Sequence, residues 1–190
     1  MSLSAQDEIY LSLENTELVK VNIADCTTEI IGRTGFQMYD IAINPVDQKM
    51  YGVSAELDLY EINVENASTR YIGQTDKFFN ALAFSDEGIL YGMTARDDIF
   101  YQISTGSGRV TELGSVIEDI RSAGDINIYK DKMYLFANPD LLVEINLDNF
   151  EESRVLGSLG ISGIWGATSA GCDSRFYIGA GTDIYTLADD

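Results

Sequence analysis

Residues 50–63 read MYGVSAELDLYEIN, which is an aromatic β-type strand, a tight acidic turn and a second strand. The same phrase occurs five times, and its marker tyrosines are spaced by 41, 40, 43 and 43 residues. A period near forty residues is typical of radial β-architectures, in which each repeat is a small sheet that buries its faces against its neighbours. The marker tyrosines are Tyr10, Tyr51, Tyr91, Tyr134 and Tyr177.

Two further strands are predicted between successive phrases. One ends in a glycine at the same phase of the repeat, at Gly32, Gly73, Gly114 and Gly157. The other is followed by Asn-, Asp-, Pro- or Gly-containing turns. Four strands in an up-and-down meander of this length make one blade of a β-propeller. Small residues such as Ala42, in the strand before each turn, predict the inner strand, because backbones crowd near the central axis.

We therefore predict an all-β fold, a β-propeller of four-stranded antiparallel blades. We name the strands of a blade inner, second, third and outer. Residues 1–190 are expected to form one propeller domain of five blades and 18 strands, with an imperfect seam. The first blade is predicted to lack its inner strand, and the last to lack its outer strand. The repeats cover about residues 8–39, 40–79, 80–122, 123–163 and 164–190.

The incomplete first and last repeats leave three other arrangements open. The chain can form four blades with surplus N-terminal strands, it can be a piece of a longer propeller, or two chains can complete each other. Unpaired strand edges favour association, so a homodimer through the seam is also expected.

The stretch from Leu82 to Gly92, LAFSDEGILYG, resembles bacterial propeller repeats of the NHL and gluconolactonase-like kind. The resemblance extends over nearly the whole chain and implies a shape, not a reaction, because enzymes, lectins and scaffolds share such repeats. A gluconolactonase-like site would hold a divalent metal with carboxylate and amide ligands, for which Asp40, Asn80 and Asp125 are the matching residues. The family's ligands sit in a six-bladed frame, and the chain matches only part of that pattern.

The charge balance limits the expected partners. Twelve basic residues stand against 31 acidic ones, a net charge of −19. Such a surface repels the phosphates of nucleic acids and anionic membranes. Cations, basic proteins and neutral ligands such as carbohydrates remain as partners.

The two cysteines, Cys26 and Cys172, are too few and too far apart for a disulfide framework or a zinc site. A disulfide between them across the seam is a minor prediction. No stretch has the length of a membrane span, and residues 1–7 lack the regions of a signal peptide. We expect a soluble protein, with an extracytoplasmic or secreted location slightly favoured over the cytoplasm.

Acidic residues recur in the turns between second and third strands. Strand topology places these turns on the same face as the loops that lead from outer to inner strands; we call it the entrance face. Asp40 and Asp125 lie there at the mouths of two inner strands, where Ca²⁺ or another divalent cation would find oxygen ligands. Most of the turn acids are expected to be structural. They are Glu14, Glu17, Glu56, Asp58, Asp97, Asp98, Asp140 and Asp183.

Large aromatic residues also gather in the loops of the entrance face, namely Phe36, Tyr39, Phe78, Phe79 and Trp165. Aromatic rings beside Asp and Asn side chains can hold sugars or other neutral ligands. Most of these rings are expected to fill the spaces between blades, and Tyr39 and Trp165 are the best candidates for exposure. The predicted ligand-binding residues are Tyr39, Asp40, Phe79, Asn80, Asp125 and Trp165.

The chain has no histidine, which excludes Ser-His-Asp and Cys-His catalysis and imidazole metal sites. The sequence therefore favours a non-catalytic binding or protein-interaction module that uses the entrance face. The alternative is a metal-assisted hydrolase of small lactones or esters.

Overall fold

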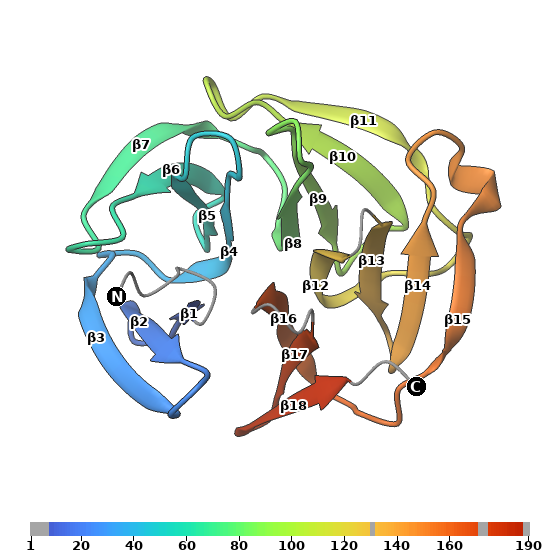
Figure 1. The fold of residues 1–190 in the computed structure, drawn as a ribbon. Helices are drawn as coiled ribbons and strands as arrows, with labels where there is room; N and C mark the ends of the chain where they lie inside the picture. Colours follow the sequence, from blue (N-terminus) through green and yellow to red (C-terminus); the bar gives the residue numbers. More distant parts are fainter. Residues whose placement is uncertain (1–7, 130–131, 171–174, 188–190) are drawn as a thin grey trace.

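Five small antiparallel sheets stand around a common hub and form a five-bladed β-propeller (Figure 1). The structure, a computed structural model, describes residues 8–129, 132–170 and 175–187. Within these ranges blades 2, 3 and 4 have four strands each, and blades 1 and 5 have three. This confirms the predicted propeller, including its 18 strands and the two incomplete blades.

The inner strands follow one another around the hub, and each contacts the next. Between the last and the first of them, the second strand of blade 1, β1 (Glu8–Ser12), contacts both neighbours. The edge of β1 therefore stands where blade 1 has no inner strand. The inner strands are β4 (Met38–Ile43), β8 (Phe79–Phe84), β12 (Ser122–Tyr129) and β16 (Ile164–Ala170).

The second and third strands supply most of the core. Their side chains alternate between the two faces of a blade, so each blade presents apolar groups to both neighbours. The second strands after β1 are β5 (Met50–Ser54), β9 (Leu90–Thr94), β13 (Lys132–Ala137) and β17 (Arg175–Ala180). The third strands are β2 (Glu17–Asn22), β6 (Asp58–Ile62), β10 (Ile99–Ile103), β14 (Leu141–Ile145) and β18 (Asp183–Leu187).

The outer strands are largely exposed, and each pairs with its third strand through a β-bulge directly before the recurrent glycine. The bulge bends the strand and increases its twist, which suits the periphery of a propeller. A short 3-10 turn, η2 (Phe150–Glu152), precedes the outer strand of blade 4. The outer strands are β3 (Thr27–Arg33), β7 (Thr69–Gln74), β11 (Val110–Ser115) and β15 (Arg154–Ser158).

Four of the five spaces between blades contain a shared hydrophobic cluster. Tyr60 and Leu18 belong to the cluster between blades 1 and 2, and Leu59 and Phe79 to the cluster between blades 2 and 3. Similar clusters join blades 3 and 4 and blades 4 and 5. The described members of the fifth cluster all belong to blade 1. The ring is therefore held by four apolar interfaces and has a different seam between blades 5 and 1.

Helical structure plays little part in this fold. In the described ranges no helix has the length and apolar character needed to cross a membrane.

Candidate functional site

Each inner strand begins with a β-bulge where it pairs with the second strand of its blade. A bulge places one or more unpaired residues in a strand and turns their side chains, and bulges are frequent beside functional sites. Three of the six predicted site residues are bulge residues. The extra residues are Tyr39 in β4, Asn80 in β8, Ala123 and Gly124 in β12, and Trp165 in β16.

Two of these bulge residues present aromatic rings at the hub. Tyr39 is 43% exposed and Trp165 is 42% exposed. The Tyr39 ring meets the ring of Phe78 edge-on, at 6.0 Å between centroids. The Trp165 ring lies over Gly179, where an added Cβ would be 2.5 Å from it, and its Nε1 donates to the carbonyl of Gly181 at 3.0 Å. Gly179 therefore provides the surface on which the indole rests.

The structure places Phe79 and Asn80 in a different setting from these two exposed rings. Phe79 is 1% exposed, packs edge-on against Tyr101 and belongs to the cluster between blades 2 and 3. Phe79 pairs with Thr94 one position before the bulge, so its side chain turns into the core. Asn80 is partly buried, and its Oδ1 has no hydrogen-bond partner. Neither residue lines the cavity described below.

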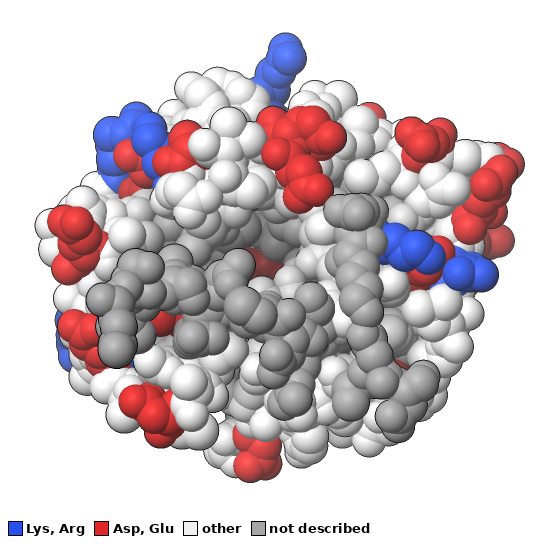
Figure 2. All heavy atoms as spheres, viewed as in Figure 1, with Lys and Arg blue, Asp and Glu red and all other residues white. Residues whose placement is uncertain are grey.

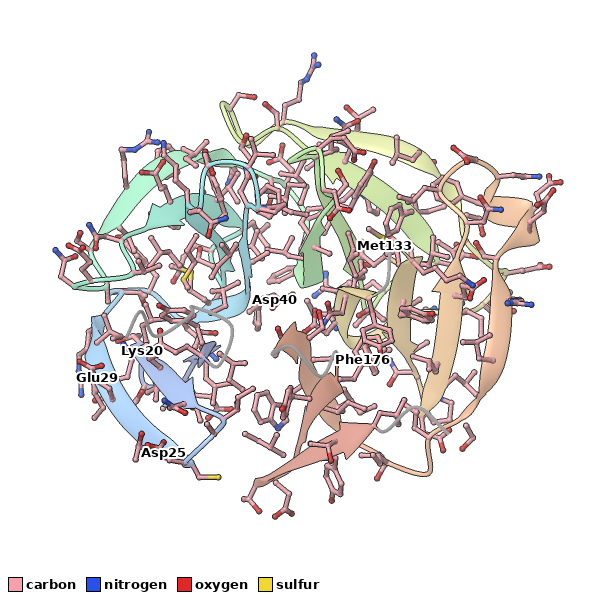
Figure 3. The ribbon with its side chains drawn as sticks, in the orientation of Figure 1. Lys20, Asp25, Glu29, Asp40, Met133 and Phe176 are labelled. Carbon is pink, nitrogen blue, oxygen red and sulfur yellow. The ribbon has the colours of Figure 1, made fainter. Side chains whose placement is uncertain are left out.

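Asp40 and Asp125 are buried at equivalent positions of blades 2 and 4, with Asp40 at the hub in Figure 3. Asp40 accepts from the N–H of Ile41 at 2.7 Å and from the N–H of Leu82 in blade 3 at 2.5 Å. Asp125 accepts from the N–H of Ile126 at 2.7 Å and from the N–H of Ala167 in blade 5. Each carboxylate therefore joins the inner strands of two neighbouring blades.

These contacts satisfy backbone groups that have no strand partner. The inner strand is the edge of its sheet, and unpaired N–H groups on a buried edge are costly. Two carboxylates serve four N–H donors on four inner strands. The two aspartates thus have a structural role that the sequence pattern did not reveal.

The same burial makes both carboxyl groups difficult to ionise. Desolvation raises the pKa of Asp40 and of Asp125 well above the usual value of 3.8, although the backbone N–H donors oppose it. The negative charge of Asp40 further raises the pKa of Asp125. The hub therefore favours proton uptake.

A cavity of about 890 Å³ passes through the hub and extends into the seam; we call it the central cavity. Figure 2 shows the hollow, with acidic atoms visible in its depth. Tyr39 and Trp165 line its entrance side, and Pro45 and Asp86 line the opposite side. Its described lining contains five acidic residues and no Lys or Arg. The acids are Glu8, Glu14, Asp40, Asp86 and Asp125.

The wall of this cavity at the seam was not predicted from the sequence. Leu11 and Leu13 come from blade 1, and Tyr177 and Ile184 come from blade 5. The missing inner strand of the first repeat was the available signal, because it leaves β1 beside the hub.

A second groove, of about 1,070 Å³, lies on the outer side of blades 3 and 4. Its lining includes Leu113, Phe150 and Glu151. It contains none of the inner-strand bulge residues and neither buried carboxyl group. The central cavity is therefore the better candidate for a ligand site.

Several turn acids fasten the ends of outer strands. Glu17 forms an ion pair with Arg33 at 3.1 Å, and Asp98 accepts from the Ser115 hydroxyl at 3.1 Å. Asp140 accepts from the hydroxyl of Ser158. These contacts support the expected structural role for acids in the turns.

Cation binding by Asp40 and Asp125 stays a prediction. Both oxygens of each carboxylate accept backbone N–H donors, so an ion would have to replace those bonds. Among the described side chains, no three Asp, Glu or Cys residues gather as metal ligands, and Asn80 lies outside the cavity lining. Cys26 is an exposed free thiol, whereas Cys172, its predicted disulfide partner, lies outside the described residues.

No known protein family matches the sequence, and no curated protein is similar to it. Solved structures are similar in fold. A structural genomics protein of unknown function from Bacteroides thetaiotaomicron has a TM-score of 0.69 at 14% identity, over 96% of this chain and 56% of its own. The present chain thus spans little more than half of that protein.

Two further structures support the same architecture. A chain of a nidogen/laminin complex has a TM-score of 0.69 at 10% identity, over 97% of this chain and 72% of its own. Virginiamycin B lyase from Staphylococcus aureus has a TM-score of 0.59 at 11% identity, over 98% of this chain and 68% of its own. These neighbours are β-propeller proteins, and at such identities they share the fold alone. The chain is therefore a β-propeller protein, in agreement with the resemblance of its repeats.

Proposed function

We propose that the protein is a non-catalytic binding module and that the central cavity holds its ligand. The observation that carries the proposal is that one cavity is lined both by two half-exposed aromatic rings, Tyr39 and Trp165, and by two buried carboxyl groups. A concave site with aromatic walls and few polar groups is typical of ligand binding. Its volume, about 890 Å³, falls in the usual range for such sites.

The lining limits the ligand classes. The described lining carries acidic groups and no Lys or Arg, which disfavours anionic ligands, and the rings offer stacking or cation–π contact. Cationic and neutral ligands fit these features, including a basic protein segment, a carbohydrate or a divalent cation. Metal-assisted hydrolysis stays an alternative prediction that no contact in the cavity specifically favours.

The test is titration calorimetry of the full chain with three probes: calcium chloride, a neutral methyl glycoside and a basic hexapeptide. We expect at least one probe to bind, and we expect Tyr39→Ala and Trp165→Ala to weaken its binding. Tyr71→Ala is the matched control, because Tyr71 is an exposed aromatic on β7 outside the cavity. Binding that survives both cavity substitutions, or no binding of any probe, would reject the proposal.

A further inference from the structure

We infer that the central cavity takes a basic, apolar peptide in extended conformation, which adds to the free edge of β1 as the inner strand that blade 1 lacks. The inference rests on the proposed function and deepens it, because it names the ligand class and its place.

The free edge of β1 is the first part of the argument. In blades 2 to 5 the second strand pairs on one side with an inner strand and on the other with a third strand. In the described ranges β1 pairs with β2 alone. An open strand edge offers unpaired N–H and C=O groups, and an extended peptide can satisfy them by adding a strand.

The repeat also defines the register of the added strand. Ile9 pairs with Val21 as Met50 pairs with Ile62, so Ile9 and Met50 are equivalent. Met50 faces Ile43 at the end of β4, and Ser54 faces Met38 near its start. The peptide would therefore run antiparallel to β1, with its N-terminal end near Leu13. Six residues of strand span about 20 Å.

The cavity walls on both sides of the seam, next to this edge, contain apolar side chains. Leu11 and Leu13 flank it in blade 1, and Trp165 and Ile184 face the cavity from blade 5. Trp165 and Ile184 are 42% and 46% exposed. Apolar peptide side chains would cover them and bury surface that the present seam leaves open.

Charge complementarity determines the chemistry of the peptide. Glu14 lies at the entrance end of β1, and Asp86 lies at the opposite end of the cavity. Both are exposed, and neither has an ion-pair partner among the described residues, whereas Glu8 pairs with Lys20 at 3.3 Å. Lysine or arginine at the two ends of the peptide would meet these acids. A second copy of this chain fits less well, because two bodies of net charge −19 repel each other.

The experiment uses the fluorescence of Trp165, the single tryptophan of the chain, as a reporter inside the cavity. The probe is acetyl-Lys-Ala-Ile-Ala-Ile-Lys-amide, and the full chain is titrated at low salt. We expect saturable binding with a change in Trp165 emission. The same peptide with glutamate in place of both lysines should not bind. N-methylation at the two central residues should weaken binding by about fivefold or more, because it removes strand hydrogen bonds.

Protein variants test the position of the peptide. Glu14→Gln and Asp86→Asn should each weaken binding about two- to fivefold at low salt, the usual range for an exposed ion pair. Glu65→Gln is the control, because Glu65 is an exposed acid in the turn between β6 and β7 and lies outside the cavity. Replacing only the N-terminal lysine of the peptide should remove the effect of Glu14→Gln and leave that of Asp86→Asn, as the antiparallel register requires.

Three outcomes would overturn the inference: equal binding of the lysine and glutamate peptides, equal binding of the N-methylated peptide, or binding that Glu14→Gln and Asp86→Asn leave unchanged. If the glycoside or calcium binds with dependence on Tyr39 and the basic peptide does not, the inference fails and the proposed function stands. If no probe binds, both fail.

Discussion

Asp40 and Asp125 combine two opposed effects in one position. Each carboxylate accepts N–H groups from two inner strands, which favours the ionised form, yet desolvation outweighs those bonds and raises the pKa of each. Glu144 in β14 is the opposite case. Its hydrogen bond from Lys132, supported by Arg154, lowers the pKa of its carboxyl group. The contributions of these two kinds of carboxyl group to the free energy of unfolding should therefore change with pH in opposite directions.

We predict that the stability lost in Asp125→Asn becomes smaller as pH rises from the usual carboxyl pKa of 3.8 toward the raised pKa of Asp125 in the folded protein. The pKa of Asp125 is raised on folding, so the folded state binds more protons in this window and the contribution of this group to the free energy of unfolding falls as pH rises. The control is Glu144→Gln. Because the pKa of Glu144 is lowered, its contribution is present above its usual 4.5 and is lost at lower pH.

Urea denaturation at several pH values measures both differences. The cost of Glu144→Gln should grow as pH rises through the carboxyl range, while that of Asp125→Asn shrinks. Parallel pH profiles for the two variants would mean that Asp125 ionises as an ordinary surface carboxyl.

The strand pattern was predictable because each strand carries its own local signals. Aromatic and β-branched residues mark the second and third strands, and Asn, Asp, Pro and Gly mark the turns after the inner strands. The bulges left no such signal. Tyr39 and Phe79 are both aromatic residues near the start of an inner strand, yet Phe79 is equivalent to the buried Met38, and Tyr39 is equivalent to Asn80. A shift of one residue along the strand therefore moves a side chain from a core position to a bulge position.

The role of the buried aspartates was also outside the reach of sequence reasoning. Their oxygen atoms serve N–H groups 42 residues away, on Leu82 and Ala167, and that contact depends on how neighbouring blades stack. In the sequence, a carboxylate at the start of an inner strand is equally consistent with a metal ligand and with an acceptor for backbone N–H groups. Composition and spacing do not distinguish these two roles, whereas the geometry of the hub shows the backbone contact.

The recurrent glycine of the outer strands shows the same dependence on a neighbouring blade. A Cβ on Gly73 of β7 would lie 2.0 Å from the carbonyl oxygen of Ser107, in the turn after β10 of the next blade. A Cβ on Gly157 of β15 would meet no atom within 4 Å. The two glycines occupy the same place in the repeat, and of the two only Gly73 has backbone atoms of the next blade where a Cβ would lie.

We predict that Gly73→Ala lowers the free energy of unfolding by about 1–3 kcal/mol, because blades 2 and 3 must separate at their outer contact. Gly157→Ala should change it by less than about 0.5 kcal/mol or raise it slightly, since alanine restricts the unfolded chain. Chemical denaturation of both variants against the wild type gives the comparison. A cost for Gly157→Ala as large as that for Gly73→Ala would show that β15 is covered in solution.

The ring as a whole is closed unequally. Leu59 in β6 and Ile184 in β18 occupy the same position of the third strand, as do Tyr60 and Tyr185. Leu59 is 0% and Tyr60 is 5% exposed, while Ile184 is 46% and Tyr185 is 40% exposed. Blade 5 therefore carries core-type side chains on β18 without the cover that the complete blades have. This is the region where a partner, a ligand or the predicted second copy would add most stability.

The unequal closure predicts different costs for the same truncation at equivalent positions. Leu59→Ala should lower the free energy of unfolding by about 2–5 kcal/mol, because it opens a cavity between blades 2 and 3. Ile184→Ala should cost less than about 1 kcal/mol, because its side chain already contacts solvent. Denaturation at two protein concentrations, with light scattering of the same samples, measures both the cost and the mass. A monomer with a large cost at Ile184 would contradict the open seam. A cost at Ile184 that grows with concentration, together with a doubled mass, would instead support the predicted homodimer, since association stabilises by mass action.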